Sequence, residues 1–137
     1  ERTVQVAEHG MSVRDNHIYL APGNGHLICV RENSGISIRI ADSFAASHYC
    51  PSVDAMLESV AEAYGAKALA IVLSGMGNDG ASGARLLRQR DATIVVQDPK
   101  TSVVWGMPGS VARQGIANAV MNPDQISVFL QKLVAHQ

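Results

Sequence analysis

An apolar strand, a glycine-rich turn and a helix follow one another directly in the middle of this chain. Residues 68–73 are apolar without polar alternation, which is typical of a strand covered on both faces. The turn at residues 74–80 leads into a predicted helix that runs to about Arg90, and a second apolar strand is predicted at residues 93–96. Strand, helix and strand in this order form a parallel crossover. The sequence therefore predicts an α/β fold, with a doubly wound, mostly parallel sheet sandwiched by helices in a Rossmann-like three-layer arrangement.

A β-hairpin and two further helices complete the predicted fold. The turn residues 33–35, Asn-Ser-Gly, separate two apolar runs at 26–31 and 36–40, so we expect a hairpin appended to the sheet. Residues 52–64 and 122–134 carry apolar side chains at helical spacing. The length of 137 residues fits a single domain.

The ends of these two helices carry recognisable signals. Ser52 suits the N-cap of the first helix, Asp54 suits its first turn, and Gly65 suits its end. Asn122 suits the N-cap of the last helix, with Pro123 in its first turn. We therefore expect both helices to begin and end at these residues.

Charge and composition exclude several classes of function. The 11 Lys and Arg residues and 12 Asp and Glu residues nearly cancel, so nothing drives the chain onto nucleic acid or into an anionic membrane. No apolar run reaches the roughly 18 residues that a transmembrane helix needs, and no signal peptide is visible. Cys29 and Cys50 lack metal-ligand or redox spacing, so we expect buried thiols in a reducing, cytoplasmic compartment.

The glycine spacing of the central turn allows a nucleotide-binding interpretation. Gly75, Gly77 and Gly80 have the spacing of the dinucleotide fingerprint, and Asp98 lies 18 residues further on, near where a ribose-binding acid is found. Asp79 argues against this interpretation, because a second anion at the helix N-terminus would repel a pyrophosphate. A nucleotide-binding βαβ module stays open as an alternative function.

Asp79 itself suggests a different purpose for the turn. A carboxylate at a helix N-terminus meets free backbone N–H groups and the positive end of the helix dipole. An oriented carboxylate can hold a catalytic histidine in the right tautomer and stabilise its imidazolium form. A backbone N–H of the same turn can stabilise an oxyanion. The alternative is that Asp79 only caps its own helix. Asp54, Asp79 and Asp98 also suggest a cation site, but simpler roles explain Asp54 and Asp98, so we expect no metal.

Residues 73–81, Leu-Ser-Gly-Met-Gly-Asn-Asp-Gly-Ala, closely resemble the signature of the chemotaxis protein-glutamate methylesterase (CheB) catalytic domain. Further collinear matches occur at residues 18–23 with His26, 51–54, 97–98, 101–104 and 106–108. The resemblance implies hydrolysis of glutamate methyl esters on chemoreceptors, and in many members deamidation of receptor glutamines, by a Ser-His-Asp triad without a cofactor. It places the catalytic aspartate at Asp79, the oxyanion-binding N–H at Met76, and the active-site turn at Gly75 and Gly77.

The same resemblance implies that part of the catalytic machinery is missing. In the family the nucleophilic serine lies on a Gly-Ser-Thr-Gly-Gly turn, upstream of everything present here, and the histidine also lies upstream. No such turn occurs in residues 1–137, and Ser74 and Ser102 match non-nucleophilic positions. We expect the five histidines to be surface or hairpin residues rather than the missing base; they are His9, His17, His26, His48 and His136.

These departures lead to a specific expectation about domain organisation. The chain is expected to be the C-terminal portion of a methylesterase catalytic domain, inactive alone, in a protein that can also carry a receiver domain. The start at Glu1, in what reads as the tail of a structural element, fits a piece of a longer chain. A degenerate domain that only docks onto chemoreceptors is a further alternative.

Overall fold

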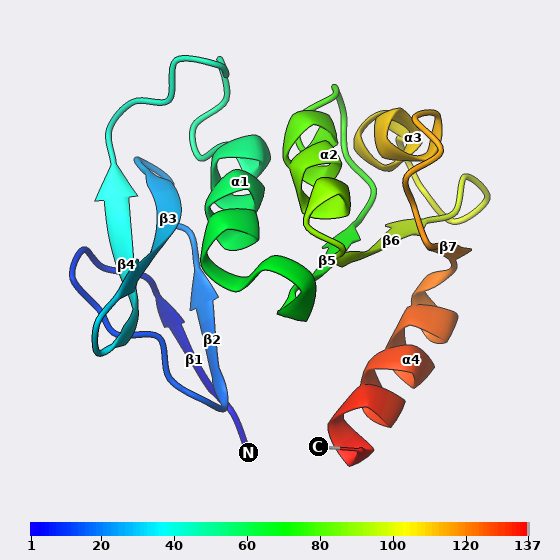
Figure 1. Cartoon of the computed structure of the whole chain (residues 1–137). Helices are drawn as coiled ribbons and strands as arrows, with labels where there is room; N and C mark the ends of the chain where they lie inside the picture. The colour runs from blue at the N-terminus through cyan, green and yellow to red at the C-terminus, as the bar shows by residue number, and fades with distance from the viewer. Residues whose placement is uncertain (137) are drawn as a thin grey trace.

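The computed structural model describes residues 1–136 and has an α/β fold (Figure 1). Its strands are β1 (Thr3–Val6), β2 (His17–Leu20), β3 (His26–Glu32), β4 (Gly35–Ala41), β5 (Leu69–Val72), β6 (Thr93–Gln97) and β7 (Ala119–Met121). Its helices are α1 (Val53–Tyr64), the 3₁₀ turn η1 (Gly65–Lys67), α2 (Ala81–Gln89), α3 (Gly106–Ala112) and α4 (Pro123–Ala135). None of these helices is both long enough and apolar enough to cross a membrane.

The strands form three separate sheets. β5, β6 and β7 pair in parallel in that order, and β1 pairs with β2 in parallel. β3 and β4 form the expected antiparallel hairpin, in which Glu32 pairs with Gly35. The predicted α/β class is confirmed. The parallel strands lie in two sheets instead of one, since no strand within residues 1–136 joins β1–β2 to β5.

Helices lie on both sides of the parallel strands. In Figure 1, α1, α2 and α3 lie above β5 and β6, and α4 lies below. α1 begins at the expected N-cap, Ser52, whose side chain accepts a hydrogen bond from the Ala55 N–H, and it ends at Gly65. α4 begins with a capping box in which Asn122 and Gln125 exchange hydrogen bonds. Both predicted boundaries are confirmed, because they depend on residues next to each other in the sequence.

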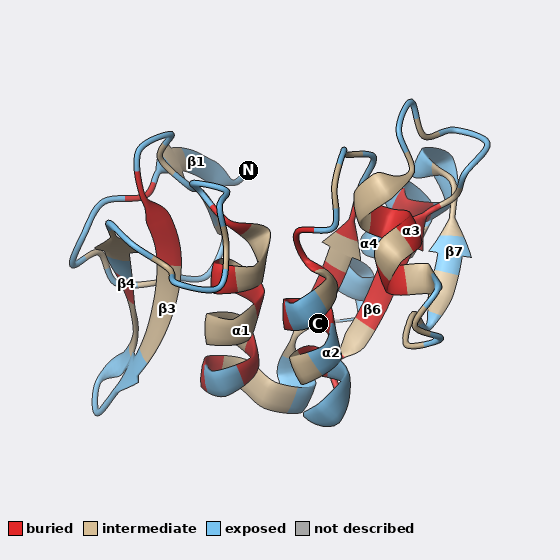
Figure 2. Cartoon of the chain, turned by 90° about the horizontal axis from the view of Figure 1, so that it is seen from above, coloured by how far each residue is buried: buried red, intermediate tan, exposed pale blue. Residues whose placement is uncertain are grey.

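The core has two parts, which α1 joins. Figure 2 shows the buried residues gathered on α1 and β3 and on β6 and α3. The larger cluster packs α1 and α2 against β5 and β6, and the smaller one lies inside the hairpin around Leu27 and Ile38. Met56 of α1 contacts both clusters. The helix start at residues 52–54 is therefore fixed between the hairpin and the parallel strands.

The cysteines differ from the expectation of two buried thiols. Cys29 is half-buried in β3, and its burial raises the pKa of the thiol, partly offset by a hydrogen bond with Ser59. Cys50 is exposed because it lies in the loop that leads from β4 to α1. Both thiols are free, as the sequence predicted.

The small residues of α2 serve a close contact between two helices. Gly80 and Gly83 both face α1. A Cβ on Gly83 would lie 2.6 Å from the Leu57 Cβ and 3.2 Å from the Asp54 carbonyl oxygen. Ala84 and Leu87 of the same helix are fully buried in the larger core cluster. The glycines therefore set the distance between α1 and α2.

Replacing Gly83 with alanine tests this contact. In an ordinary helix interior, a glycine-to-alanine change stabilises by about 0.5–1 kcal/mol. Here we expect a loss of about 1–3 kcal/mol in the free energy of unfolding, because the added methyl overpacks against the α1 backbone. Urea unfolding measures the difference, with Ser82→Ala at the neighbouring exposed position as the control. A stabilised Gly83→Ala variant would show that the helices can separate without cost.

Candidate functional site

Two loops meet at the carboxyl ends of β5 and β6, the edge at which parallel α/β sheets bind their ligands. The Ser74 N–H donates to the Gln97 side-chain oxygen at 2.7 Å. The Gly75 N–H donates to the Val104 carbonyl at 3.0 Å, and the Gly75 carbonyl accepts from the Met107 N–H at 2.9 Å. The turn at residues 74–80 is thus held by the loop that leads into α3.

The glycines of the turn make room for protein side chains. A Cβ added to Gly75 would meet Met107, one on Gly77 would meet Tyr49, and one on Gly80 would meet Val53. Gly77 and Gly80 also have positive φ angles of 87° and 99°, which L-residues with side chains rarely adopt. The glycine spacing is therefore explained by packing and backbone conformation within the chain itself.

Asp79 is buried, with 5% of its surface exposed, and its carboxylate binds the start of α1. Its Oδ1 accepts hydrogen bonds from the Ser52 hydroxyl at 3.0 Å and from the Asp54 N–H at 2.9 Å. Its Oδ2 accepts from the Val53 N–H at 2.7 Å. The carboxylate thus takes two free N–H groups of a helix that lies 25 residues earlier in the chain.

Asp54 makes the reciprocal contact. Its Oδ1 accepts from the N–H groups of Gly80 at 3.0 Å and Gly83 at 2.8 Å, so it satisfies the start of α2. Burial raises the pKa of Asp54; the hydrogen bond from Gly83 lowers it, and the negative charge of Asp79 raises it further. The alternative, that Asp79 only caps its own helix, is therefore wrong. Each aspartate caps the other's helix, because α1 and α2 begin side by side.

This exchange of caps bears on the nucleotide-binding alternative. In a dinucleotide site the pyrophosphate takes the N–H groups at the start of the helix. Here the Asp54 carboxylate already accepts from two of those groups. Asp98 accepts from the Thr101 N–H and hydroxyl, as expected of a turn residue. The geometry argues against a nucleotide at this turn.

The three aspartates do not combine into a cation site. Asp98 holds its own turn, whereas Asp54 and Asp79 are taken up by helix N-termini. Within residues 1–136, no three His, Cys, Asp or Glu side chains lie where they could share a metal ion.

His26 lies closer to this region than the sequence suggested. It belongs to the hairpin, as expected, but it is buried, and its Nδ1 accepts the Ser52 N–H at 3.0 Å. Within the described residues, no histidine hydrogen-bonds to Asp79. Ser74 and Ser102 both donate their hydroxyl protons to backbone carbonyls. The described part of the chain therefore contains no nucleophilic serine paired with a histidine that hydrogen-bonds to Asp79.

Met76 lies at the opposite extreme of exposure from Asp79. Its surface is 80% exposed, and no acceptor within residues 1–136 takes its N–H. The neighbouring Gly75 donates its N–H to Val104 and accepts from Met107 at its carbonyl, and a Cβ on Gly77 would meet Tyr49. The Met76 N–H is thus one of four backbone donors, at residues 76–79, that have no acceptor within residues 1–136, and it directly follows the hydrogen-bonded Gly75.

Sequence reasoning missed several residues that build this region. Tyr49 belonged to no motif. Ser52 was identified as a helix cap, and residues 51–54 and 97–98 matched the family, but no partner was assigned to Ser52 or Gln97. Gln97 bridges the two loops by accepting from Ser74 and donating to Thr101. Besides that match, the usable signal was that Gln97 is polar at the end of an otherwise apolar strand.

Comparisons with known proteins agree on one family. The sequence profile of CheB methylesterase matches residues 1–130. A "protein-glutamate methylesterase/protein-glutamine glutaminase 1" from Saccharophagus degradans is 46% identical over 123 residues, which are 90% of this chain and 33% of the relative. One from Caulobacter vibrioides is 42% identical over 130 residues, which are 93% of this chain and 37% of the relative.

A solved structure matches the fold as well. The crystal structure of the Thermotoga maritima CheB methylesterase catalytic domain superposes with a TM-score of 0.89 at 35% identity. The match covers 94% of this chain and 68% of that domain. The chain therefore spans about a third of the length of the curated relatives that it matches and about two thirds of the solved domain.

Proposed function

This chain belongs to the CheB methylesterase family, and from that premise we propose that it is the C-terminal part of a catalytic domain that hydrolyses glutamate methyl esters on chemoreceptors. The enzyme is a carboxylic ester hydrolase of bacterial chemotaxis that works in the cytoplasm. Deamidation of receptor glutamines by the same site accords with the names of the relatives.

The observation that carries this proposal is the placement of Asp79. A triad aspartate must be buried, must be held rigidly and must keep an acceptor for the imidazole N–H. Asp79 is almost fully buried and accepts three hydrogen bonds from the start of α1. It lies in the turn after β5, at the strand end where α/β enzymes place their sites. Asp79 is the catalytic aspartate in this proposal.

The N–H of Met76 supplies the oxyanion donor in the same proposal. It is free within the described residues and lies in a turn that is supported from both sides. A backbone donor held in place before the reaction stabilises the charge that develops on the ester oxygen, by about 3 kcal/mol per donor. Gly75 and Gly77 keep that backbone in position.

The nucleophilic serine and the histidine come from the part of the domain outside this chain. A groove of about 260 Å³ lies beside β5; α1, β5 and the two residues that follow β5 line most of it, including Val53 and Ile71. It adjoins the helix start that binds Asp79. An element packed in this groove would bring its side chains close to that carboxylate.

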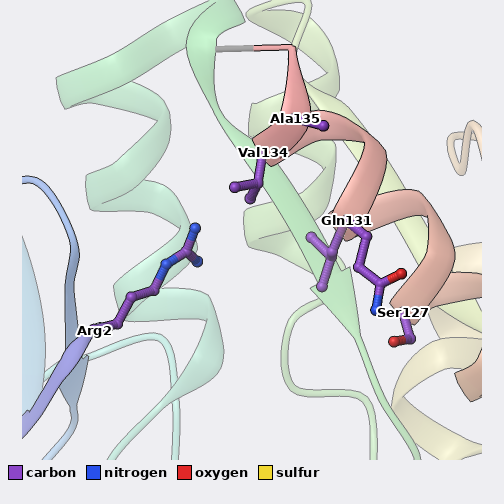
Figure 3. Close-up of a pocket in the computed structure, with 6 residues that line it drawn as sticks. Arg2, Ser127, Gln131, Val134 and Ala135 are labelled. Atoms are coloured by element: carbon purple, nitrogen blue, oxygen red, sulfur yellow. The ribbon is translucent and has the colours of Figure 1, made fainter.

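Two further apolar surfaces support this arrangement. Val4 and Val6 of β1 pair with Ile18 and Leu20 of β2, so four exposed apolar side chains share one face of that ladder. A second hollow, of about 440 Å³, lies between Arg2 and the face of α4 that carries Gln131 and Val134 (Figure 3). The third of the Thermotoga domain that this chain does not match is the occupant that we assign to these surfaces.

The reaction in the complete enzyme is acyl transfer. The serine oxygen attacks the glutamyl ester carbonyl while the histidine takes its proton. Asp79 holds the imidazole in the productive tautomer, and the Met76 N–H binds the oxyanion. Methanol leaves with the proton from the histidine, and water then hydrolyses the acyl-enzyme to free glutamate. A receiver domain on the same chain is the proposed regulator.

Methanol release tests the proposal. The full-length protein is incubated with chemoreceptors that carry labelled methyl esters, and volatile label is counted over time. We expect release in proportion to enzyme, and none with heat-denatured enzyme. Intact full-length protein that binds receptors without releasing methanol would overturn the proposal in favour of a receptor-docking domain.

A further inference from the structure

We infer that Ser52 is a positioning residue for Asp79, and that it leaves Oδ2 as the carboxylate oxygen that accepts the histidine N–H. The inference rests on the proposed function. It assigns a role in the reaction to a residue that otherwise reads only as the N-cap of α1.

Ser52 is fixed at both its hydroxyl and its backbone. It is 2% exposed, and its Oγ accepts from the Ala55 N–H at 3.3 Å. Its backbone N–H donates to Nδ1 of His26 at 3.0 Å, which ties it to the hairpin. Because an Oγ lone pair is taken by α1, the single hydroxyl proton is directed to Asp79 Oδ1, 3.0 Å away.

Counting acceptor positions shows which oxygen remains available. A carboxylate has about four lone-pair positions, two on each oxygen. Oδ1 of Asp79 uses both, for the Ser52 hydroxyl and the Asp54 N–H. Oδ2 uses one, for the Val53 N–H. One position on Oδ2 is therefore free for an imidazole donor.

Losing the Ser52 hydroxyl would free one position on Oδ1. The carboxylate could then rotate, and either oxygen could meet the imidazole. Small errors in the position of a catalytic group cost up to about 100-fold in rate. The inference thus predicts a defect in the chemical step, with little effect on substrate binding.

The test uses the full-length enzyme and compares Ser52→Ala with Asn122→Ala. Both variants remove a side chain that caps a helix N-terminus, so both are expected to lower the unfolding midpoint. Of these two residues, only Ser52 hydrogen-bonds to Asp79, whereas Asn122 accepts from the Gln125 N–H. We expect Ser52→Ala to lower kcat at least tenfold with KM unchanged within about twofold, and Asn122→Ala to keep both constants.

A kinetic double-mutant cycle shows whether Ser52 acts through Asp79. In an Asp79→Asn background, Ser52→Ala should lower kcat by no more than about twofold, because the group that it positions is already changed. The inference would be overturned if Ser52→Ala lowered kcat by the same factor in the Asp79→Asn background as in the parent enzyme. An equal loss of kcat in Asn122→Ala would also overturn it.

A second cycle, on unfolding, separates this inference from the proposed function. The free energies of unfolding are measured for Ser52→Ala, Asp79→Asn and the double variant. The coupling free energy is the difference between the double variant's loss and the sum of the two single losses, and its measurement needs no catalytic activity. Absence of coupling overturns the inference even in an active enzyme. An inactive parent enzyme in which the coupling is present overturns the proposed function, and the catalytic role of Ser52 with it.

Discussion

Asp79→Asn in the full-length enzyme is expected to lower kcat for methyl ester hydrolysis by about 10⁴-fold. The asparagine side chain has one acceptor oxygen and one amide NH₂ group. The amide cannot both anchor to α1 and stabilise the imidazolium that forms when the serine is deprotonated. In serine proteases the equivalent change costs about 10⁴ in rate, because it selects the wrong histidine tautomer. Methanol release under saturating receptor measures the loss.

Stability must be measured beside activity, because Asp79 also caps α1. Three donors point at its carboxylate, and an amide NH₂ facing one of them leaves a buried N–H unpaired. Each such loss costs about 1–3 kcal/mol, which thermal unfolding detects. Asp98→Asn is the matched control, since Asp98 follows the neighbouring strand and only holds Thr101. Near-normal turnover in a folded Asp79→Asn enzyme would remove Asp79 from the mechanism.

The second large effect concerns residues 1–137 on their own, which are expected to give no methanol release above the blank. The reason is chemical: the hydroxyls of Ser52, Ser74 and Ser102 are engaged in structural hydrogen bonds. No histidine within residues 1–136 contacts Asp79. The chain thus holds one of the three triad groups that the proposed mechanism needs.

The isolated chain needs a folding control, because exposed apolar faces on β1, β2 and α4 favour aggregation. Circular dichroism should show helical content before the assay is interpreted. The full-length protein at equal concentration gives the positive control. Methanol release by the folded fragment would mean that one of its own serines is the nucleophile, and the division of the triad proposed above would be wrong.

Local signals in the sequence predicted most of the elements. The spacing of apolar residues predicted α1, α2 and α4, and the cap residues Ser52, Gly65 and Asn122 fixed two helix starts and one end. β7 was missed because Ala119–Met121 is too short to show a period. α3 begins at Gly106, two residues before Pro108, and the Trp105 carbonyl accepts the Gly109 N–H.

The candidate site was predicted less completely than the fold. Asp79 and the turn around Met76 were identified, but their partners were not. Asp79 was expected to interact with its own helix, whereas its three donors lie 25 to 27 residues away along the chain. The spacing of the turn glycines allowed a nucleotide-binding interpretation. In the structure, side chains of the protein itself lie beside these glycines; they are Tyr49, Met107 and Val53.

Sequence alone determined where most of the strands and helices form and which turn carries the acidic side chain, because periodicity and capping act between residues a few positions apart. Tertiary structure decided what that side chain binds. The close packing of α1 on α2 at Gly83 brings two helix N-termini together, and each then takes the carboxylate of the other. Buried N–H groups must find acceptors, and which acceptor is nearest depends on how the helices pack.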